Sequence, residues 1–206
     1  MNDSVIIRPA EPADVDAIHR LITDNLEVGH LLPRSADDIA RCIARFVVAT
    51  VGAGASAATA KQPGRRAAVV GCAELAPLST GVAEVRSLVV SEKFRGRQIG
   101  PTLVSRVAAD ATAKGFATLC AFAHEPSHFV RMGFTIVPHM WVPEKITHDC
   151  TSCSLFRRCG QHAVMLPLRA GVEVGPERPA AVIHGSRAAS GRRLALRPVP
   201  AEAIPA

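Results

Sequence analysis

The residues best suited to chemistry lie in one segment, EVRSLVVSEKFRGRQIGPTLVSRVAADATAKG, from Glu84 to Gly115. Its apolar start predicts a strand, its middle a basic loop with glycines, and its end an amphipathic helix. The N-terminus of a helix offers backbone N–H groups without intrahelical acceptors, and its dipole favours anions. The segment therefore predicts a phosphate site in the loop. A plain helix start with surface arginines is the alternative.

The strand of this segment, Val82–Val90, carries two charges. Strict alternation places Glu84, Arg86 and Leu88 on one face and Val85, Ser87 and Val89 on the other. Charges on a central strand are costly unless they line a wet cleft or pair with each other. In a cleft, the guanidinium of Arg86 would bind a substrate carboxylate, and Glu84 would take a proton from an attacking amine, directly or through a water. A mutual Glu84–Arg86 salt bridge at the end of the sheet is the alternative.

The elements that position these residues follow from hydrophobic periodicity and from turn residues. Ser35 is expected to cap a helix, and Gly115 to end one. The expected strands are Val5–Arg8, Phe46–Thr50, Ala67–Leu75, Val82–Val90, Thr118–Ala123, Phe134–Val137 and His162–Leu168. The expected helices are Glu11–Asn25, Ala36–Arg45, Ile99–Lys114 and Pro126–Met132. This order predicts an α/β (α+β) fold, a mixed sheet with helices on both faces.

Composition excludes several functions. The net charge is +6, but the residues from 169 onward, with six arginines and three glutamates, supply +3 of it. The remaining +3 is spread over the rest of the chain without a basic stripe. Aromatic residues make up 4% and Tyr is absent, which argues against a nucleic-acid partner. We also expect no membrane partner, because no apolar run reaches about 18 residues. The first residues, MNDSVIIRPAEP, lack a signal-like apolar core, so we expect a cytoplasmic protein.

Two segments differ from the rest of the chain. Residues 51–66 are rich in Gly and Ala and predict a flexible loop. Residues 169–206, rich in Pro, Ala and Arg, predict a mostly disordered tail. The working domain is therefore expected over residues 1–168.

The order of elements, with SLVVSEKFRGRQIG entering a helix and HFVRMGF after the next strand, resembles the GCN5-related N-acetyltransferase (GNAT) superfamily. The resemblance implies a mixed, mostly antiparallel sheet and acetyl-CoA as co-substrate. By position, the backbone of Leu88, Val89 and Val90 would meet the thioester and pantetheine arm. The pyrophosphate would be bound by Arg95, Gly96, Arg97, Gln98, Ile99 and Gly100. The family pattern has Gly where this chain has Gln98, a difference that is tolerable if Gln98 need not adopt a positive φ.

Three further stretches, HLLPRS, AEVRSLVV and PEKITHDCTSCSLFRRCGQHAVMLPL, resemble the acetyltransferase domain of bacterial N-acetylglutamate synthases, above all its short stand-alone group. That resemblance implies transfer to the α-amino group of an amino acid, with L-glutamate expected first, as in the first step of arginine biosynthesis. Arg34 and Lys145 would be further contacts for a dicarboxylate. For Lys145 we favour a solvated surface charge.

Two other functions stay open. One is N-acetylation of a different amino acid or small amine, and the other is a non-catalytic acyl-CoA-binding or zinc-stabilised interaction module. The identity of the general acid is also open. Many of these enzymes have a Tyr where this chain has Phe129, which cannot donate a proton. Either a dedicated acid is dispensable, because the CoA thiol is a good leaving group, or water, His124 or His128 serves.

The cysteines divide into two groups. Cys42, Cys72 and Cys120 stand in apolar surroundings and are expected in the core. The second group, Cys150, Cys153 and Cys159 with His148 or His162, has some of the spacing of a zinc site. We favour reduced thiols and no metal, because only one C-x2-C pair is present. The sheet edge near the last strand could pair in a homodimer.

Overall fold

The structure is a computed structural model, and it describes residues 4–27, 31–52, 67–172 and 174–175. The expected loop at 51–66 falls outside these residues except at its first two positions. Most of the expected tail at 169–206 also lies outside them. Residues Met1–Pro176 form one compact unit.

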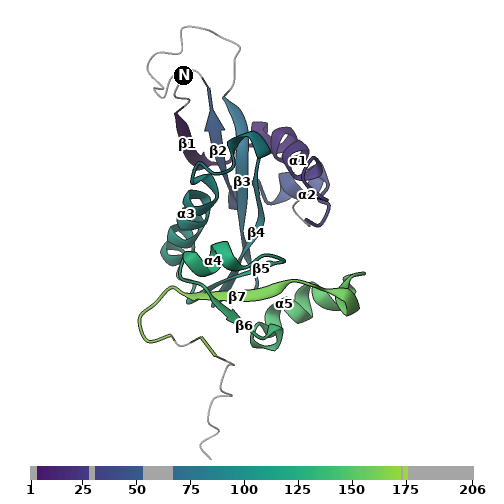
Figure 1. Cartoon of the computed structure of the whole chain (residues 1–206), viewed down its shortest axis with the longest axis vertical. Coiled ribbons are helices and arrows are strands. Elements are labelled where there is room, and N and C mark those ends of the chain that lie inside the picture. The colour runs from purple at the N-terminus through teal and green to yellow at the C-terminus, as the bar shows by residue number, and fades with distance from the viewer. Residues whose placement is uncertain (1–3, 28–30, 53–66, 173, 176–206) are drawn as a thin grey trace, which may run out of the picture. The chain divides into compact units, whose positions relative to one another are not determined.

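Seven strands of the described residues form one sheet in the order β1-β2-β3-β4-β5-β7-β6 (Figure 1). Neighbouring strands are antiparallel except β4 and β5, which are parallel. The predicted mixed, mostly antiparallel sheet is thus confirmed. The strands are β1 (Val5–Pro9), β2 (Phe46–Val51), β3 (Ala68–Pro77), β4 (Val82–Val90), β5 (Thr118–Ala123), β6 (Thr135–Val137) and β7 (His162–Pro167).

In the described part of the chain, five α-helices flank the sheet: α1 (Val15–Thr23), α2 (Ala36–Arg41), α3 (Ile99–Ala113), α4 (Ser127–Arg131) and α5 (Pro143–His148). Short 3-10 helices cover Pro12–Asp14, Ile43–Arg45, Glu92–Phe94, His139–Trp141, Cys150–Ser152 and Phe156–Arg158. The predicted cap of α2 is confirmed, because the Ser35 hydroxyl accepts a hydrogen bond from Asp38 N at 3.1 Å. Gly115, at φ 85°, ends α3 as predicted. Within the described ranges, no helix is long and apolar enough to cross a membrane.

The helices cover both faces of the sheet (Figure 1). The face below α3 and α4 forms the main apolar core, which includes Leu103, Val107 and Phe129. On the opposite face one apolar cluster lies beneath α1 and α2, and a second lies beside α5. Cys42 and Cys72 belong to the first of these clusters and Cys120 to the second, so their predicted core positions are confirmed.

Strand β4 loses its β5 partner early. The parallel register joins Val82–Glu84 to Thr118–Cys120 and extends no further, although β4 continues to Val90. Beyond Glu84 the two strands diverge, and Figure 1 shows β5 and β7 crossing the direction of β3 and β4. The last strand in the sequence, β7, lies one strand in from the edge of the sheet: it pairs with β5 on one side and with the edge strand β6 on the other.

Candidate active site

Six charged side chains lie together on the sheet face that carries α1, α2 and α5. We call them the charged row: Arg34, Glu74, Glu84, Arg86, Lys145 and Asp149. Three cations and three anions balance one another. Among the described residues, no buried side-chain nitrogen or oxygen lacks a hydrogen-bond partner. Pairing thus offsets the cost of burying these charges.

One end of the charged row is a buried ion pair. Arg34 Nη1 donates to Glu74 Oε2 at 2.8 Å, and these side chains are 18% and 2% exposed. Arg34 also lies 3.4 Å from Ser87 Oγ and 3.3 Å from Cys42 Sγ. The segment before α2 is thereby fastened to β3 and β4.

The other end centres on Glu84, the last residue of β4 in register with β5. Arg86 Nε donates to Glu84 Oε2 at 3.0 Å, and Lys145 Nζ donates to Oε1 at 2.8 Å. Asp149 accepts from Arg86 and, at 2.9 Å, from Lys145. The Glu84–Arg86 salt bridge is therefore present, but within a network of four residues. The expectation that Lys145 is a solvated charge is wrong, because its side chain is only 13% exposed.

Charge balance fixes the ionisation of this network. Burial opposes the charge of Arg86, but the carboxylates of Glu84 and Asp149 outweigh it and raise the pKa of Arg86. Burial also raises the pKa of Asp149, but hydrogen bonds from Lys145 and His148 and the charge of Arg86 lower it to about 2. At neutral pH this network thus holds a charged guanidinium opposite a charged Asp149 carboxylate.

A bulge in β4 changes which side chains face the charged row. Glu74 pairs with Arg86 and Cys72 with Val89, so β4 takes three steps where β3 takes two. Ser87 at the bulge has φ 51°. Leu88 consequently packs with the core below α3, and Val89 with the cluster beneath α1. The alternation predicted through Leu88 is therefore wrong beyond Arg86.

The basic loop leads from β4 into α3 through two residues with positive φ. Gly96 has φ 76°, and Gln98, the N-cap of α3, has φ 61° and ψ 13°. The condition set for Gln98, that it avoid a positive φ, is not met. A non-glycine residue pays about 1–2 kcal/mol for the left-handed conformation. The backbone thus keeps the path that glycine would favour.

The two loop arginines have intramolecular partners. Arg95 donates to Val90 O at 3.1 Å and to Asn25 Oδ1 at 2.9 Å, which braces the loop against β4 and the turn after α1. The guanidinium of Arg97 lies 5.0 Å from the centre of the Phe94 ring. Both cations remain beside the N-terminus of α3, where the first N–H groups have no intrahelical acceptor.

Phe129 and the two histidines considered as general acid lie in different surroundings. Phe129 is 4% exposed and packs edge-on against Phe134 in the core. His128 is half-buried beside Phe129, and burial lowers the pKa of its imidazole. His124 packs against Gly160, because a Cβ on that glycine would lie 3.3 Å from its Nδ1. Phe129 therefore contributes to the packing of the core.

The second cysteine group forms no metal site in the described part of the chain, where no three His, Cys, Asp or Glu side chains are grouped to hold an ion. Cys150 and Cys153 are half-buried and Cys159 is exposed, all as free thiols. The geometry thus gives no support to the zinc-stabilised alternative.

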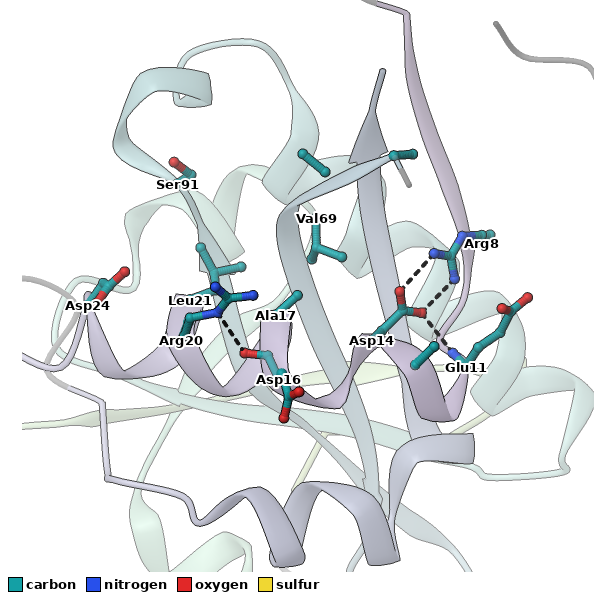
Figure 2. A pocket seen from close by; sticks show the side chains of 13 residues that line it. Arg8, Glu11, Asp14, Asp16, Ala17, Arg20, Leu21, Asp24, Val69 and Ser91 are labelled. Carbon is teal, nitrogen blue, oxygen red and sulfur yellow. Dashed lines mark hydrogen bonds and ion pairs between the residues drawn. The ribbon is translucent and has the colours of Figure 1, made fainter. Parts of the chain in front are cut away.

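A separate hollow of about 740 Å³ lies beside α1 and the start of β3 (Figure 2). Arg8 and Asp14 form an ion pair at its rim, at 2.7 Å. Four carboxylates against two arginines make the hollow acidic, so it disfavours phosphate. None of the site residues predicted from the sequence lines it.

A sheet that opens between parallel strands, followed by a basic loop at a helix N-terminus, defines a class of transferases that bind an acyl carrier by its phosphates. Residues 18–134 match the model of the acetyltransferase (GNAT) family. The chain is also 30% identical over 162 residues to the uncharacterized N-acetyltransferase CT2212 of Chlorobaculum tepidum, covering 79% of this chain and 96% of the relative. The chain belongs to the GNAT family and is an N-acetyltransferase, as predicted.

Solved structures share the fold at lower identity. Rv2747 from Mycobacterium tuberculosis, solved in complex with CoA and NLQ, has a TM-score of 0.61 at 20% identity, covering 79% of this chain and 98% of that one. N-acetylglutamate synthase from Neisseria gonorrhoeae, complexed with coenzyme A and N-acetyl-glutamate, has a TM-score of 0.65 at 23% identity. That match covers 82% of this chain and 36% of the longer protein.

GNAT enzymes use acetyl-CoA as co-substrate, and the residues present fit it. A Cβ on Gly96 would meet no atom within 4 Å, and one on Gly100 would meet only a Val90 methyl, at 3.9 Å. Space therefore lies in front of the α3 N-terminus, where phosphate is favoured. When bound, acetyl-CoA supplies a thioester as acetyl donor.

The sequence did not predict two members of the charged row, and it predicted the wrong environment for a third. Glu74 and Asp149 received no role in the sequence analysis, and Lys145 was taken for a surface charge. Glu74 could have been noticed, because it interrupts the apolar strand VVGCAELA. Lys145 and Asp149 carry no such signal, because a short helix brings them to Glu84 from 61 and 65 residues away in the sequence.

Proposed function

We propose that this N-acetyltransferase acetylates the α-amino group of an amino acid, with L-glutamate as the first candidate acceptor. One observation carries the proposal. Arg86 and Lys145 place two cations beside Glu84, at the point where β4 and β5 separate. An amino acid presents a carboxylate and an amine on one carbon, and this group of charges is complementary to both.

Arg86 is the proposed ligand of the α-carboxylate, because a guanidinium can donate two parallel hydrogen bonds to one carboxylate. Lys145 would contribute a second cation to the same anion. The Arg34–Glu74 pair lies on the same face, and Arg34 is the candidate contact for a side-chain carboxylate. A dicarboxylic acceptor is the class that uses all three cations.

Glu84 is the proposed base. Its Oε2 accepts from Arg86 and Lys145, whereas Oε1 accepts from Lys145 alone. Oε1 therefore keeps a lone pair for the proton of the attacking ammonium. Because the side chain is 4% exposed, a bridging water would carry that proton.

The amine would attack the thioester carbonyl directly, without an acyl-enzyme, and the C–S bond would break with CoA leaving as a thiolate. Backbone N–H groups of β4 near Leu88, Val89 and Val90 would polarise the carbonyl, and the loop from Arg95 to Gly100 would bind the pyrophosphate. Relatives support the acceptor, because the Neisseria gonorrhoeae enzyme binds N-acetyl-glutamate on a shared fold. Transfer to a different amino acid or small amine is the alternative within the same chemistry.

Release of free thiol from acetyl-CoA tests the proposal against a panel of L-glutamate, L-glutamine, L-aspartate and simple amines. We expect turnover to be fastest with an amino acid, and fastest of all with L-glutamate. Tight coenzyme binding without turnover of any amine would leave only the non-catalytic alternative.

Two variants separate the assigned roles. Arg86→Ala is expected to raise the KM for the amino acid more than about tenfold, through loss of a charge-assisted contact. Glu84→Gln keeps the shape and is expected to lower kcat about 100-fold or more, through loss of a base. The exposed Glu92→Gln is the matched control. An unchanged KM for Arg86→Ala would show that Arg86 does not bind the α-carboxylate.

A further inference from the structure

Asp149 holds its carboxylate on the cations that the proposed function assigns to the substrate. Its Oδ2 accepts from Arg86 Nη2 and, at 2.9 Å, from Lys145 Nζ. Its Oδ1 lies 2.9 Å from His148 Nδ1. An aspartate side chain and the carboxylate of an amino acid are chemically the same group, so they compete for the same two donors.

Glu84 and Asp149 share these donors, but they are held differently. The side chain of Glu84 is 4% exposed and rises from a central strand, whereas that of Asp149 is 30% exposed. Asp149 is the C-cap of α5, where a negative charge faces the carbonyl end of the helix. Its position therefore depends on the cations, and solvent can replace it.

We propose that Asp149 determines acceptor specificity: its carboxylate occupies the Arg86–Lys145 anion site, and the acceptor's carboxylate must displace it. The inference rests on the proposed function. After displacement, Glu84 still bonds Arg86 Nε at 3.0 Å and Lys145 Nζ at 2.8 Å. The two cations thus stay in place while the exposed carboxylate leaves.

The exchange selects acceptors by charge. An amine without a carboxylate offers nothing to replace the contacts of Asp149, so the anion site stays closed to it. An amino acid brings a carboxylate that replaces the carboxylate of Asp149, so Arg86 and Lys145 remain paired with an anion. The apparent affinity for the acceptor equals its intrinsic affinity multiplied by the fraction of molecules in which Asp149 has left the site.

Glutarate is a suitable probe, because it has carboxylates and no amine and its binding does not depend on acetyl transfer. We would measure its Kd by calorimetry in the presence of CoA for the wild type, Asp149→Asn and Asp149→Ala. Both variants are expected to bind glutarate about three- to tenfold more tightly than the wild type. Asp110→Asn, on the opposite sheet face, removes the same charge and should leave the Kd unchanged.

Equal or weaker glutarate binding by the folded variants would overturn the proposal, because Asp149 would then be a fixed part of the site. Failure of both variants to fold would overturn it too, because Asp149 would then be required for the structure. The thiol-release assay decides the proposed function separately. A wild type without turnover whose Asp149 variants bind glutarate more tightly would refute the acceptor assignment and keep the carboxylate exchange.

Discussion

Arg34 and Glu74 form an ion pair across 40 positions of the sequence, with 2.8 Å between Nη1 and Oε2. The side chain of Glu74 is 2% exposed, so its carboxylate is buried. Burial alone would disfavour the charged form of the Arg34 guanidinium and lower its pKa. The charge of Glu74 and its hydrogen bond raise the pKa of Arg34 despite that burial. This pair connects the segment before α2 to the central strands.

Arg34→Ala should destabilise the protein strongly, because it leaves the Glu74 carboxylate buried without its cation. Loss of one partner of a buried pair costs about 3–5 kcal/mol. Urea unfolding followed by circular dichroism measures this loss. Arg41→Ala, which breaks an exposed Arg41–Asp38 pair within α2, is the matched control and should change the midpoint little. Equal midpoints for the two variants would contradict the assigned burial.

Gln98→Gly should stabilise the start of α3, because glycine adopts φ 61° without the penalty of a side chain. Gln98→Ala is the matched control, since it removes the same side chain but keeps Cβ. We expect the glycine variant to be about 1 kcal/mol more stable than the alanine variant. Thermal unfolding measures the difference, and equal stability would mean that Gln98 is not strained.

Gly100→Ala should separate stability from coenzyme binding. The added Cβ meets only Val90 at 3.9 Å, and alanine is the better helix former, so stability should rise by up to about 1 kcal/mol. A methyl group in front of the α3 N-terminus would keep a phosphate away from the N–H groups. We expect the Kd for CoA to rise about tenfold or more.

Calorimetric titration with CoA measures this effect, and melting curves of the ligand-free protein confirm the fold. Ser105→Ala, at an exposed position of the same helix, is the control and should leave the Kd unchanged. Unaltered binding by Gly100→Ala would show that the pyrophosphate lies elsewhere.

Acid should weaken the contribution of Asp149 to stability. Its folded pKa of about 2 lies below the ordinary 3.8, so the unfolded state binds the proton more readily. The contribution is full above about pH 4 and is lost as the pH falls toward 2. Because the side chain is 30% exposed, solvent screening reduces it to about 1 kcal/mol.

Urea midpoints of the wild type and Asp149→Asn at pH 5, 4, 3 and 2.5 check this prediction. The wild type should be the more stable protein at pH 5, and the two should converge at the lowest pH. A constant difference across the series would contradict the prediction, because it would show that the difference in stability does not depend on the charge of the Asp149 carboxylate.

The strands and the long helix α3 were predictable because their signals are local. Apolar runs rich in Val marked β2 to β4, and Ile99, Leu103 and Val107 marked one face of a helix closed by Gly115. The position of the basic loop followed from the same signals, because its composition and order place it between two recognisable elements.

The charged row was only partly predictable. Glu84 and Arg86 are neighbours on one strand, so their proximity is local. Lys145 and Asp149 reach them through α5, a helix of six residues that is too short to show a period. The bulge at Ser87 was also not predictable, because an argument from strict alternation assumes that no extra residue is inserted in the strand.

The place of β7 has a consequence for synthesis on the ribosome. β5 pairs with β7 from Thr118 to Ala123, and β6 pairs with the other side of β7. Until residues 162–167 leave the exit tunnel, β5 and β6 have no strand between them, and their backbone edges stay open to other chains. Nascent protein should therefore depend on chaperones up to a late point of translation.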